Sequence, residues 1–361
     1  MKHIVVILSI LSLFASCKDT THKNVETALS KEVDSIKQQI IQVAEFKGQQ
    51  VTGVSVSDSG RIFVNFPRWR KNVTNSVIEV KANNQTRSYP NAVWNSWEIG
   101  QPVVADKFVG VQSVVAFEDH LYILDTRSQL FEKVFDAPRI FLFDLKTDTL
   151  IRTYILEENS YHPDSYINDL RVDKKNNKIY LTDSGHAGLV ILDIGSGKSR
   201  RILNNHKSTS AEQSYLTFGD KKWENTVHSD GIALNSQNNR LYYHALTAYS
   251  LYSISTESLQ LEDEKQIEKN IKFEAKTAAP DGMIFDKAGN LYFADLENNK
   301  IQYRKPDGSI HTLIEGSGIK WADTFSIYDN YLYFTNSRIN EVTEDISKMT
   351  FTLNKIKLPY N

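Results

Sequence analysis

Three aspartates stand where apolar, strand-like stretches of this sequence begin. Asp230 and Asp281 each precede a glycine, and Asp323 opens a similar stretch. If the three stretches point their first residues at a common axis, the like charges raise one another's pKa unless something positive joins them. Such a group attracts a cation, either a metal ion that prefers hard oxygen ligands or an organic amine.

The same position recurs in three earlier stretches, where it holds uncharged polar residues. An alternative remains for the aspartates, because Asp before Gly at a strand start is often a turn residue that bonds its own backbone. The candidate ligand-binding ring consists of Thr52, Gln112, Asn168, Asp230, Asp281 and Asp323.

Each of these residues begins a unit that occurs six times along the chain. The unit is a stretch with apolar residues two apart, a turn rich in Asp, Asn, Gly or Lys, and a second stretch rich in aromatic residues, as in residues 279–295. This alternation predicts β-strands, and the units recur at intervals of roughly 40 to 60 residues. Third strands are predicted at 139–144, 188–193, 251–254 and 300–303, and fourth strands at 199–203 and 309–313.

Six units of four short strands predict an all-β fold, a six-bladed β-propeller over residues 40–361. A closed propeller must be fastened where its first and last blades meet. Residues 349–356 alternate well enough to complete the sixth blade, and residues 42–46 are a candidate for an additional edge strand. Apolar residues at helical spacing over 32–43 predict a short amphipathic helix. Residues 71–101 and 204–224 lack the repeat pattern and are expected to decorate one face.

The first 16 residues have the features of a bacterial lipoprotein signal peptide. A basic start is followed by an apolar run over 4–15, too short to span a membrane, and then by Cys17, the one cysteine of the chain. We therefore expect a lipid anchor on Cys17, a tether with a short helix over 17–39, and a location in the bacterial cell envelope, periplasmic or outer-membrane. The alternative is cleavage at another site, which leaves a secreted protein.

Composition and missing motifs exclude several functions. The formal net charge is −2 over 361 residues with no sustained run of Lys and Arg, so the chain lacks the electrostatic footprint of a nucleic-acid-binding protein. It contains no Gly-x-Ser-x-Gly elbow and no glycine-rich phosphate loop. His120, His228 and His244 lie near predicted strand ends, but their spacing matches no metal or nucleophile motif.

Five motifs resemble the yellow / major royal jelly protein family: 63–69 (FVNFPRW), 166–173 (YINDLRVD), 229–234 (SDGIAL), 241–246 (LYYHAL) and 279–283 (APDGM). The similarity runs in matching order from about residue 45 to 345. The resemblance implies a secreted six-bladed propeller, in a family that includes dopachrome-converting enzymes, amine-binding salivary proteins and nutritive proteins. It also places residues 336–338 near the channel, which adds Asn336 and Thr324 to the candidate ligand contacts.

The same motifs are similar, more distantly, to the gluconolactonase / senescence-marker group of metal-dependent lactone hydrolases. In that group Glu, Asn, Asn and Asp hold a divalent cation, and Asn168, Asp230 and Asp281 match three of the four positions. This implies a calcium or zinc site in which Asp281 acts as both ligand and base beside a metal-bound water. At the fourth position this sequence differs from that group, since Thr52 and Gly53 stand where the glutamate would open the first inner strand.

Aromatic side chains are candidates to complete an amine site, because a ring face attracts an ammonium group. The alternative for each is packing between blades. The candidates are Trp69, Tyr249, Trp321 and Phe325.

A second recurring set lies three positions after the aromatic residue in four of the units. We interpret it as structural, with side chains that bond the backbone at the next turn. Its members are Asp125, Asp183, Asp295 and Asn336.

The sequence leaves three classes of function open. The favoured one is an exported, lipid-anchored propeller that binds a small cationic or aromatic molecule at its central channel. The second is an enzyme, either a metal-assisted lactone hydrolase or a dopachrome-type isomerase, with Asp281 as the catalytic residue. The third is a purely structural or protein-binding propeller, whose partners the sequence does not identify.

Overall fold

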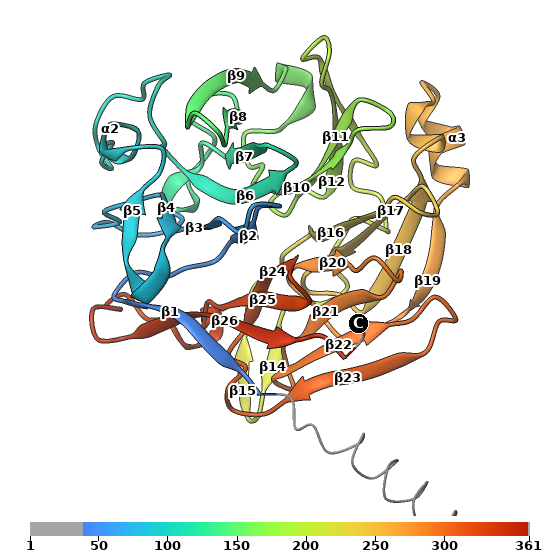
Figure 1. Cartoon of the computed structure of the whole chain (residues 1–361). Coiled ribbons are helices and arrows are strands. Elements are labelled where there is room, and N and C mark those ends of the chain that lie inside the picture. Colours follow the sequence, from blue (N-terminus) through green and yellow to red (C-terminus); the bar gives the residue numbers. More distant parts are fainter. Residues whose placement is uncertain (1–38, 360–361) are drawn as a thin grey trace, which may run out of the picture. The chain divides into compact units, whose positions relative to one another are not determined.

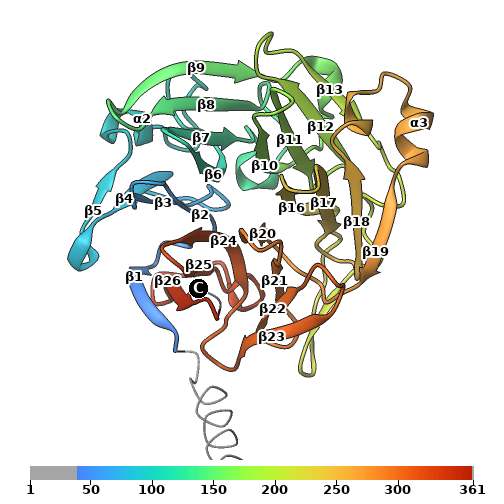
Figure 2. The ribbon, with the colours of Figure 1, turned by 45° about the vertical axis from the view of Figure 1, so that its right-hand side comes forward.

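Six four-stranded antiparallel sheets are arranged around an axis in the computed structural model, which describes residues 39–359 (Figures 1 and 2). One strand of each sheet, the inner strand, lies nearest the axis (Figure 2). The predicted all-β six-bladed propeller is confirmed.

The blades follow one another along the chain, and five of them use four consecutive strands. Blade 1 contains β2 (Val54–Val56), β3 (Ile62–Asn65), β4 (Val77–Val80) and β5 (Thr86–Ser88); blade 2 contains β6 (Val111–Phe117), β7 (His120–Asp125), β8 (Arg139–Asp144) and β9 (Thr149–Ile155); blade 3 contains β10 (Ile167–Asp173), β11 (Lys178–Asp183), β12 (Gly188–Asp193) and β13 (Ser199–Ile202). Blade 4 contains β16 (Ser229–Asn235), β17 (Arg240–Ala245), β18 (Ser250–Ser255) and β19 (Lys272–Lys276); blade 5 contains β20 (Met283–Phe285), β21 (Leu291–Asp295), β22 (Lys300–Arg304) and β23 (Ile310–Glu315).

Blade 6 joins the two ends of the propeller. Its sheet has the order β1-β26-β25-β24, formed by β1 (Ile41–Lys47), β26 (Thr350–Lys357), β25 (Tyr331–Asn336) and β24 (Ala322–Tyr328). The antiparallel register pairs Ala44 with Leu353 and Phe46 with Phe351, and all four side chains are buried. The edge strand expected over 42–46 is therefore confirmed.

The helix predicted over 32–43 is not formed at its C-terminal end, because residues 41–43 belong to β1. The apolar residues of this segment fit both the helical and the strand period. Pairing of its backbone with β26 satisfies its hydrogen bonds as a strand. The rest of that helix, the signal peptide and Cys17 lie outside the described residues.

The predicted third and fourth strands correspond to β8, β12, β18, β22, β13 and β23, with bounds that differ by at most two residues. The stretch 71–101 is not only decoration, since it contains β4 and β5, the outer strands of blade 1. Its polar outer strand, Thr86–Ser88, faces solvent and so lacks the apolar alternation that marks the other units.

Turns between strands use residues that tolerate the left-handed backbone. Asn177 and Asn239 follow the inner strands of blades 3 and 4 with φ of 55° and 53°, and Gly289 occupies the matching turn of blade 5 with φ of 84°. Asn and Gly adopt this region at lower cost than other residues. The turn-rich composition between the apolar stretches thus has a direct structural role.

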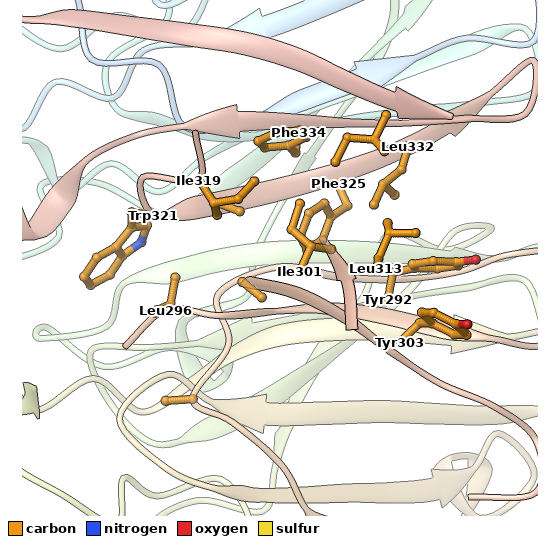
Figure 3. Packing of buried hydrophobic residues seen from close by; sticks show 14 of the residues in the cluster. Tyr292, Leu296, Ile301, Tyr303, Leu313, Ile319, Trp321, Phe325, Leu332 and Phe334 are labelled. Atoms are coloured by element: carbon orange, nitrogen blue, oxygen red, sulfur yellow. The ribbon is translucent and has the colours of Figure 1, made fainter. Parts of the chain in front are cut away.

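Large side chains fill the space between neighbouring blades. Figure 3 shows this packing between blades 5 and 6, where residues of β21 and β22 meet residues of β24 and β25. Phe325 belongs to this core and is 3% exposed. The labelled members are Tyr292, Leu296, Ile301, Tyr303, Leu313, Ile319, Trp321, Phe325, Leu332 and Phe334.

A two-stranded hairpin, β14 (Leu216–Phe218) and β15 (Lys221–Trp223), lies outside the six sheets and comes from the stretch 204–224. The helical segments are short: α2 (Ala92–Asn95), α3 (Glu264–Lys269), and the 3-10 turns η1 (Ala82–Asn84), η2 (Gln129–Phe131), η3 (Glu158–Ser160), η4 (Ser258–Gln260) and η5 (Ile339–Glu341). Within residues 39–359, no helix is long and apolar enough to cross a membrane.

Candidate functional site

The six predicted ring residues all lie at the starts of the inner strands. Thr52 and Asp281 precede β2 and β20, while Gln112, Asn168, Asp230 and Asp323 are at the second positions of β6, β10, β16 and β24. Five of them are buried, and Gln112 is partly buried. Equivalent places in successive blades therefore put these side chains at one end of the channel.

Glycines bring three inner strands close together at this end. A Cβ atom at Gly231 would clash with the carbonyl oxygen of Asp281, and one at Gly282 would clash with the carbonyl oxygen of Asp323. The Gly282 N–H donates a hydrogen bond to the Asp323 carbonyl at 2.6 Å. The Asp-Gly pairs thus have a packing role as well, because the missing Cβ lets the carboxylates of blades 4, 5 and 6 approach one another.

Burial and mutual repulsion perturb the three carboxyl groups strongly. Burial, more than any charge, raises the pKa of Asp281 to about 7, although the Trp321 indole N–H, which donates to Asp281 Oδ2 at 2.7 Å, opposes the shift. Burial and the Asp281 charge raise the pKa of Asp230 and Asp323 well above the ordinary range. Asp230 and Asp281 also share a hydrogen bond, so these carboxyls hold protons near neutral pH.

No cation of the described chain neutralises these acids. The ion pairs within residues 39–359 involve none of the three ring aspartates. Asp323 accepts instead from the hydroxyl of Thr324 at 3.2 Å. The ring is therefore a buried acidic centre without a built-in counter-ion.

The other half of the ring is a chain of amide and aromatic hydrogen bonds. The Gln112 amide donates to Asn168 Oδ1 at 2.7 Å, and its carbonyl accepts from the Tyr166 hydroxyl at 2.7 Å. Trp69 Nε1 donates to that same hydroxyl at 2.5 Å. Trp69 also stacks on Phe131, with ring centroids 5.3 Å apart, and Phe131 is 63% exposed. An aromatic wall thus runs from solvent to the ring.

The second aromatic group lies on the acidic side. Trp321 stacks on Phe218 at 5.6 Å and meets Trp223 edge-on at 4.9 Å, and both partners come from the hairpin β14–β15. The hairpin therefore supports the indole that holds Asp281. The Tyr249 hydroxyl donates a hydrogen bond to Glu297 at 2.9 Å, so its polar atom has a partner within the chain.

Two channel residues were missed from the sequence, Asp169 and Arg171. They form an ion pair at 2.7 Å, and Arg171 also donates to the Met283 carbonyl of blade 5 at 2.9 Å. Both line a cavity of about 260 Å³ that touches all six inner strands, together with Thr324 and Phe325. The register shift between Ile167 and Leu170 breaks the alternation on which the sequence argument depended.

Asn336 uses its side chain within the blade. Its oxygen accepts from the Lys320 N–H at 2.8 Å and its amide donates to the Gly318 carbonyl at 2.9 Å. Asp125, Asp183 and Asp295 likewise accept from backbone N–H groups, so the structural role inferred for this set is confirmed.

The three histidines remain apart from the ring. His244 is fully buried and bonds Ala245 and Thr277, and burial lowers its pKa to about 4. His228 accepts from the Ala211 N–H, and its pKa is also lowered by burial. His120 starts β7 at the opposite end of the inner hairpin.

The ring does not fit the divalent cation of the lactone hydrolases. At the position of their glutamate, the Thr52 hydroxyl accepts from Asn65, and any side chain at Gly53 would clash with the Asn65 amide. Asn65 thus occupies the space that a side chain at position 53 would enter. Within residues 39–359, no group of three or more His, Cys, Asp and Glu side chains is arranged to hold a metal ion. The ring therefore supports no metal-assisted step.

Comparison with known proteins identifies a family for this chain. The family model described as "Major royal jelly protein" matches residues 111–354, a span that begins with β6 of blade 2 and ends within β26 of blade 6. The chain belongs to the major royal jelly protein family. The yellow / major royal jelly resemblance is thus confirmed.

Relatives of this major royal jelly family member are distant. Major royal jelly protein 3 of Apis mellifera is 24% identical over 259 residues, which cover 65% of this chain and 47% of the relative. Dopaminechrome tautomerase of Drosophila melanogaster is 24% identical over 240 residues, which cover 60% of this chain and 50% of the relative. The chain spans about half the length of these curated relatives.

A solved structure of a gluconolactonase from Xanthomonas campestris superimposes with a TM-score of 0.55. It is 12% identical, and the match covers 89% of this chain and 90% of that one. At this identity the likeness shows a shared propeller fold alone. The activity of the gluconolactonase therefore does not transfer to this major royal jelly family member.

Proposed function

We propose that this protein binds a small cationic molecule with an aromatic body at the ring end of its channel. The observation that carries the proposal is the cluster of buried carboxyl groups of Asp230, Asp281 and Asp323, which have no ion-pair partner within residues 39–359. An ammonium group placed among them relieves their repulsion and allows their protons to leave. Buried carboxylates without a cation are costly, so the ring favours such a ligand.

The aromatic walls supply the second half of the recognition. Trp69, Phe131 and Tyr166 stand in contact beside the amide side of the ring, and Trp321 stands beside Asp281. Ring faces attract ammonium groups and also stack on flat apolar bodies. The ligand class that satisfies both features is an aromatic amine.

A second candidate function is proton-transfer isomerisation of such an amine. It is favoured by the pKa of Asp281, about 7, which suits a group that accepts and returns a proton near neutral pH. One curated relative is named dopaminechrome tautomerase. In this candidate the Asp281 carboxylate takes a proton from the bound molecule and returns it at another atom, while Trp321 orients the carboxyl.

The test measures ligand binding by calorimetry on the full chain, with phenethylamine, tetramethylammonium, glucono-lactone, calcium and zinc. We expect both ammonium compounds to bind and Asp281→Asn to weaken them at least tenfold, since the variant loses the charge but keeps the shape. Asp307→Asn, in an exposed turn, should change nothing. Binding of calcium or zinc alone, or equal amine affinity in Asp281→Asn, would contradict the proposal.

Isomerase activity is tested separately, by following the absorbance of dopaminechrome with and without the protein. Turnover that Asp281→Asn abolishes favours the enzyme. Amine binding without turnover leaves a binding protein.

We also propose that the chain is exported and anchored to the cell envelope through a lipid on Cys17. The support is the sequence of residues 1–17, an apolar run that ends at the single cysteine. Cys17→Ser should move the protein from the membrane fraction to the soluble fraction. If the variant still sediments with membranes, the anchor lies elsewhere.

A further inference from the structure

The guanidinium of Arg70 makes few contacts within the described part of the chain. It is partly buried in the loop after β3, and its one hydrogen bond among the described residues goes from Nη1 to the Gln50 side-chain oxygen at 2.5 Å. Its neighbour Arg68 donates to five acceptors, among them the carbonyls of Phe108 and Trp97. Arg68 therefore joins several loops by its hydrogen bonds. Most N–H donors of the Arg70 guanidinium have no hydrogen-bond acceptor among the described residues.

Gln50 fixes the direction in which Arg70 points. Its amide donates to the Ser337 carbonyl at 2.9 Å, so its oxygen is held against the arginine. Gln50 and Ser337 are both buried. A positioned, partly desolvated guanidinium is a strong donor to an anion, because less water must be displaced and less side-chain freedom is lost.

A cavity of about 350 Å³ opens in front of Arg70. Its walls come from residues 47–50 at the end of β1, from 67 and 70–73 in blade 1, and from 344–347 before β26. The cavity therefore lies at the junction between the first and last blades. Its size is within the range of about 300–1,000 Å³ that is usual for small-molecule pockets.

The charges around the cavity favour an anion at its floor. Lys47 and Lys71 line it with Arg70, and none of the three lies within ion-pair distance of a carboxylate among the described residues. Glu344 and Asp345 also line it, but both are exposed at the rim. Arg70 is thus the partly buried charge of the cavity, whereas the two lysines and the two acids are exposed around it. Asp345 accepts a hydrogen bond from the Ser347 N–H at 2.8 Å, which holds its carboxylate at the rim.

We propose that this cavity binds a small oxyanion, a phosphate or carboxylate group, which accepts hydrogen bonds from the free edge of the Arg70 guanidinium. Lys47 and Lys71 add charge at the rim. The anion then connects β1 with the blade 1 loop, across the closure of the propeller. The site is separate from the acidic ring, because buried Gln50 and Ser337 stand between Arg70 and Asp323.

The experiment titrates the full chain with inorganic phosphate and with acetate by calorimetry, with sodium chloride at matched ionic strength as the blank. We expect binding of at least one oxyanion, weakened at least tenfold by Arg70→Gln. Arg70→Lys should be intermediate, since it keeps the charge and loses the planar fork. Phosphate alone or acetate alone identifies which group the pocket prefers, and both outcomes support the site.

Three controls keep the result interpretable. Lys265→Gln removes one positive charge from the exposed side of α3 and should leave binding unchanged. Lys71→Gln, at an exposed position that cannot unfold the protein, should weaken binding severalfold. Asp281→Asn should leave it unchanged, which separates this site from the proposed amine site.

No oxyanion binding above the chloride blank overturns the proposal. So does an Arg70→Gln variant, shown to be folded by its melting curve, that binds as tightly as the native chain. A loss in Lys265→Gln equal to that in Arg70→Gln would mean a net-charge effect and would also overturn it.

Discussion

At the residue scale, the Asp-Gly pairs combine a packing role with a chemical one. Gly231 and Gly282 each allow the backbones of two neighbouring inner strands to come into contact. The carboxyl that precedes each glycine is then left in the ring, where Asp281 bonds Trp321 and Asp230. The turn explanation and the ligand-site explanation of these aspartates are therefore compatible.

The raised pKa of Asp281 predicts how amine binding depends on pH. A cation favours the ionised carboxylates, so affinity for tetramethylammonium, whose charge is fixed, should rise by up to about tenfold per pH unit from pH 5 toward the pKa of Asp281, about 7. Calorimetry at pH 5, 6, 7 and 8 measures this. Asp281→Asn should flatten the profile, and an affinity that falls as pH rises would contradict the assignment.

The same shift predicts the pH dependence of stability. The folded pKa of Asp281 is about 7 against an ordinary 3.8, so the folded chain binds more protons than the unfolded chain between these values. The contribution of this group to the free energy of unfolding is therefore full below about pH 4 and is lost as pH rises toward 7. The amide in Asp281→Asn does not ionise, so this variant should not lose stability as the pH rises. The melting temperature of Asp281→Asn minus that of the native chain should therefore be more positive at pH 8 than at pH 5. A difference independent of pH would argue against the raised pKa.

At the scale of elements, the hairpin β14–β15 lies outside the blades and contacts the acidic side of the ring through Trp321. Its Phe218 and Trp223 pack on Trp321, and Trp321 donates to Asp281. This gives a chain of contacts from an exposed hairpin to the buried carboxyl. The hairpin is therefore a positioning element for the proposed site.

Trp223→Ala tests this role. Loss of the edge-on contact should cost about 1 kcal/mol, and if it loosens Trp321 the affinity for phenethylamine should fall about fivefold. The exposed Lys221→Ala in the same hairpin is the control and should be silent. Unchanged affinity in Trp223→Ala would mean that Trp321 is held by the blades alone.

At the scale of the whole molecule, the closure of the propeller depends on β1. This strand comes from the N-terminal side of the chain and completes blade 6, and its Phe46 packs edge-on against Phe66 of blade 1 at 5.1 Å. Pairing with β1 covers the outer edge of β26. It also builds the cavity in front of Arg70.

Phe46→Ala should therefore lower the free energy of unfolding by about 3–5 kcal/mol, because it opens a cavity in a core that spans the junction. Ile151→Ala, on the outer strand of blade 2, should cost less than about 1 kcal/mol, since that side chain is 50% exposed. Urea unfolding compares the two. Equal costs would show that the closure adds no more stability than an exposed edge.

Much of the architecture was accessible from the sequence because repetition is a local property. Each inner strand shows alternation, each turn shows Asn, Asp or Gly, and equivalence among six units places Asp230, Asp281 and Asp323 together. The sequence did not predict the outer strand β5 of blade 1, since its residues are polar and show no apolar alternation. The helix expected at 41–43 failed because apolar residues at that spacing satisfy two periods, and pairing with β26 selected the strand.

The tertiary structure alone decided the chemistry of the sites. The Trp321 bond to Asp281, the Arg171 bond to the Met283 carbonyl and the Asn65 bond to the Gln112 carbonyl all join different blades. The Arg70 cavity joins segments nearly 300 residues apart. Periodicity specifies which face of a strand is buried, but it does not specify what that face meets. That depends on how the blades close around the axis and which polar groups are then cut off from water.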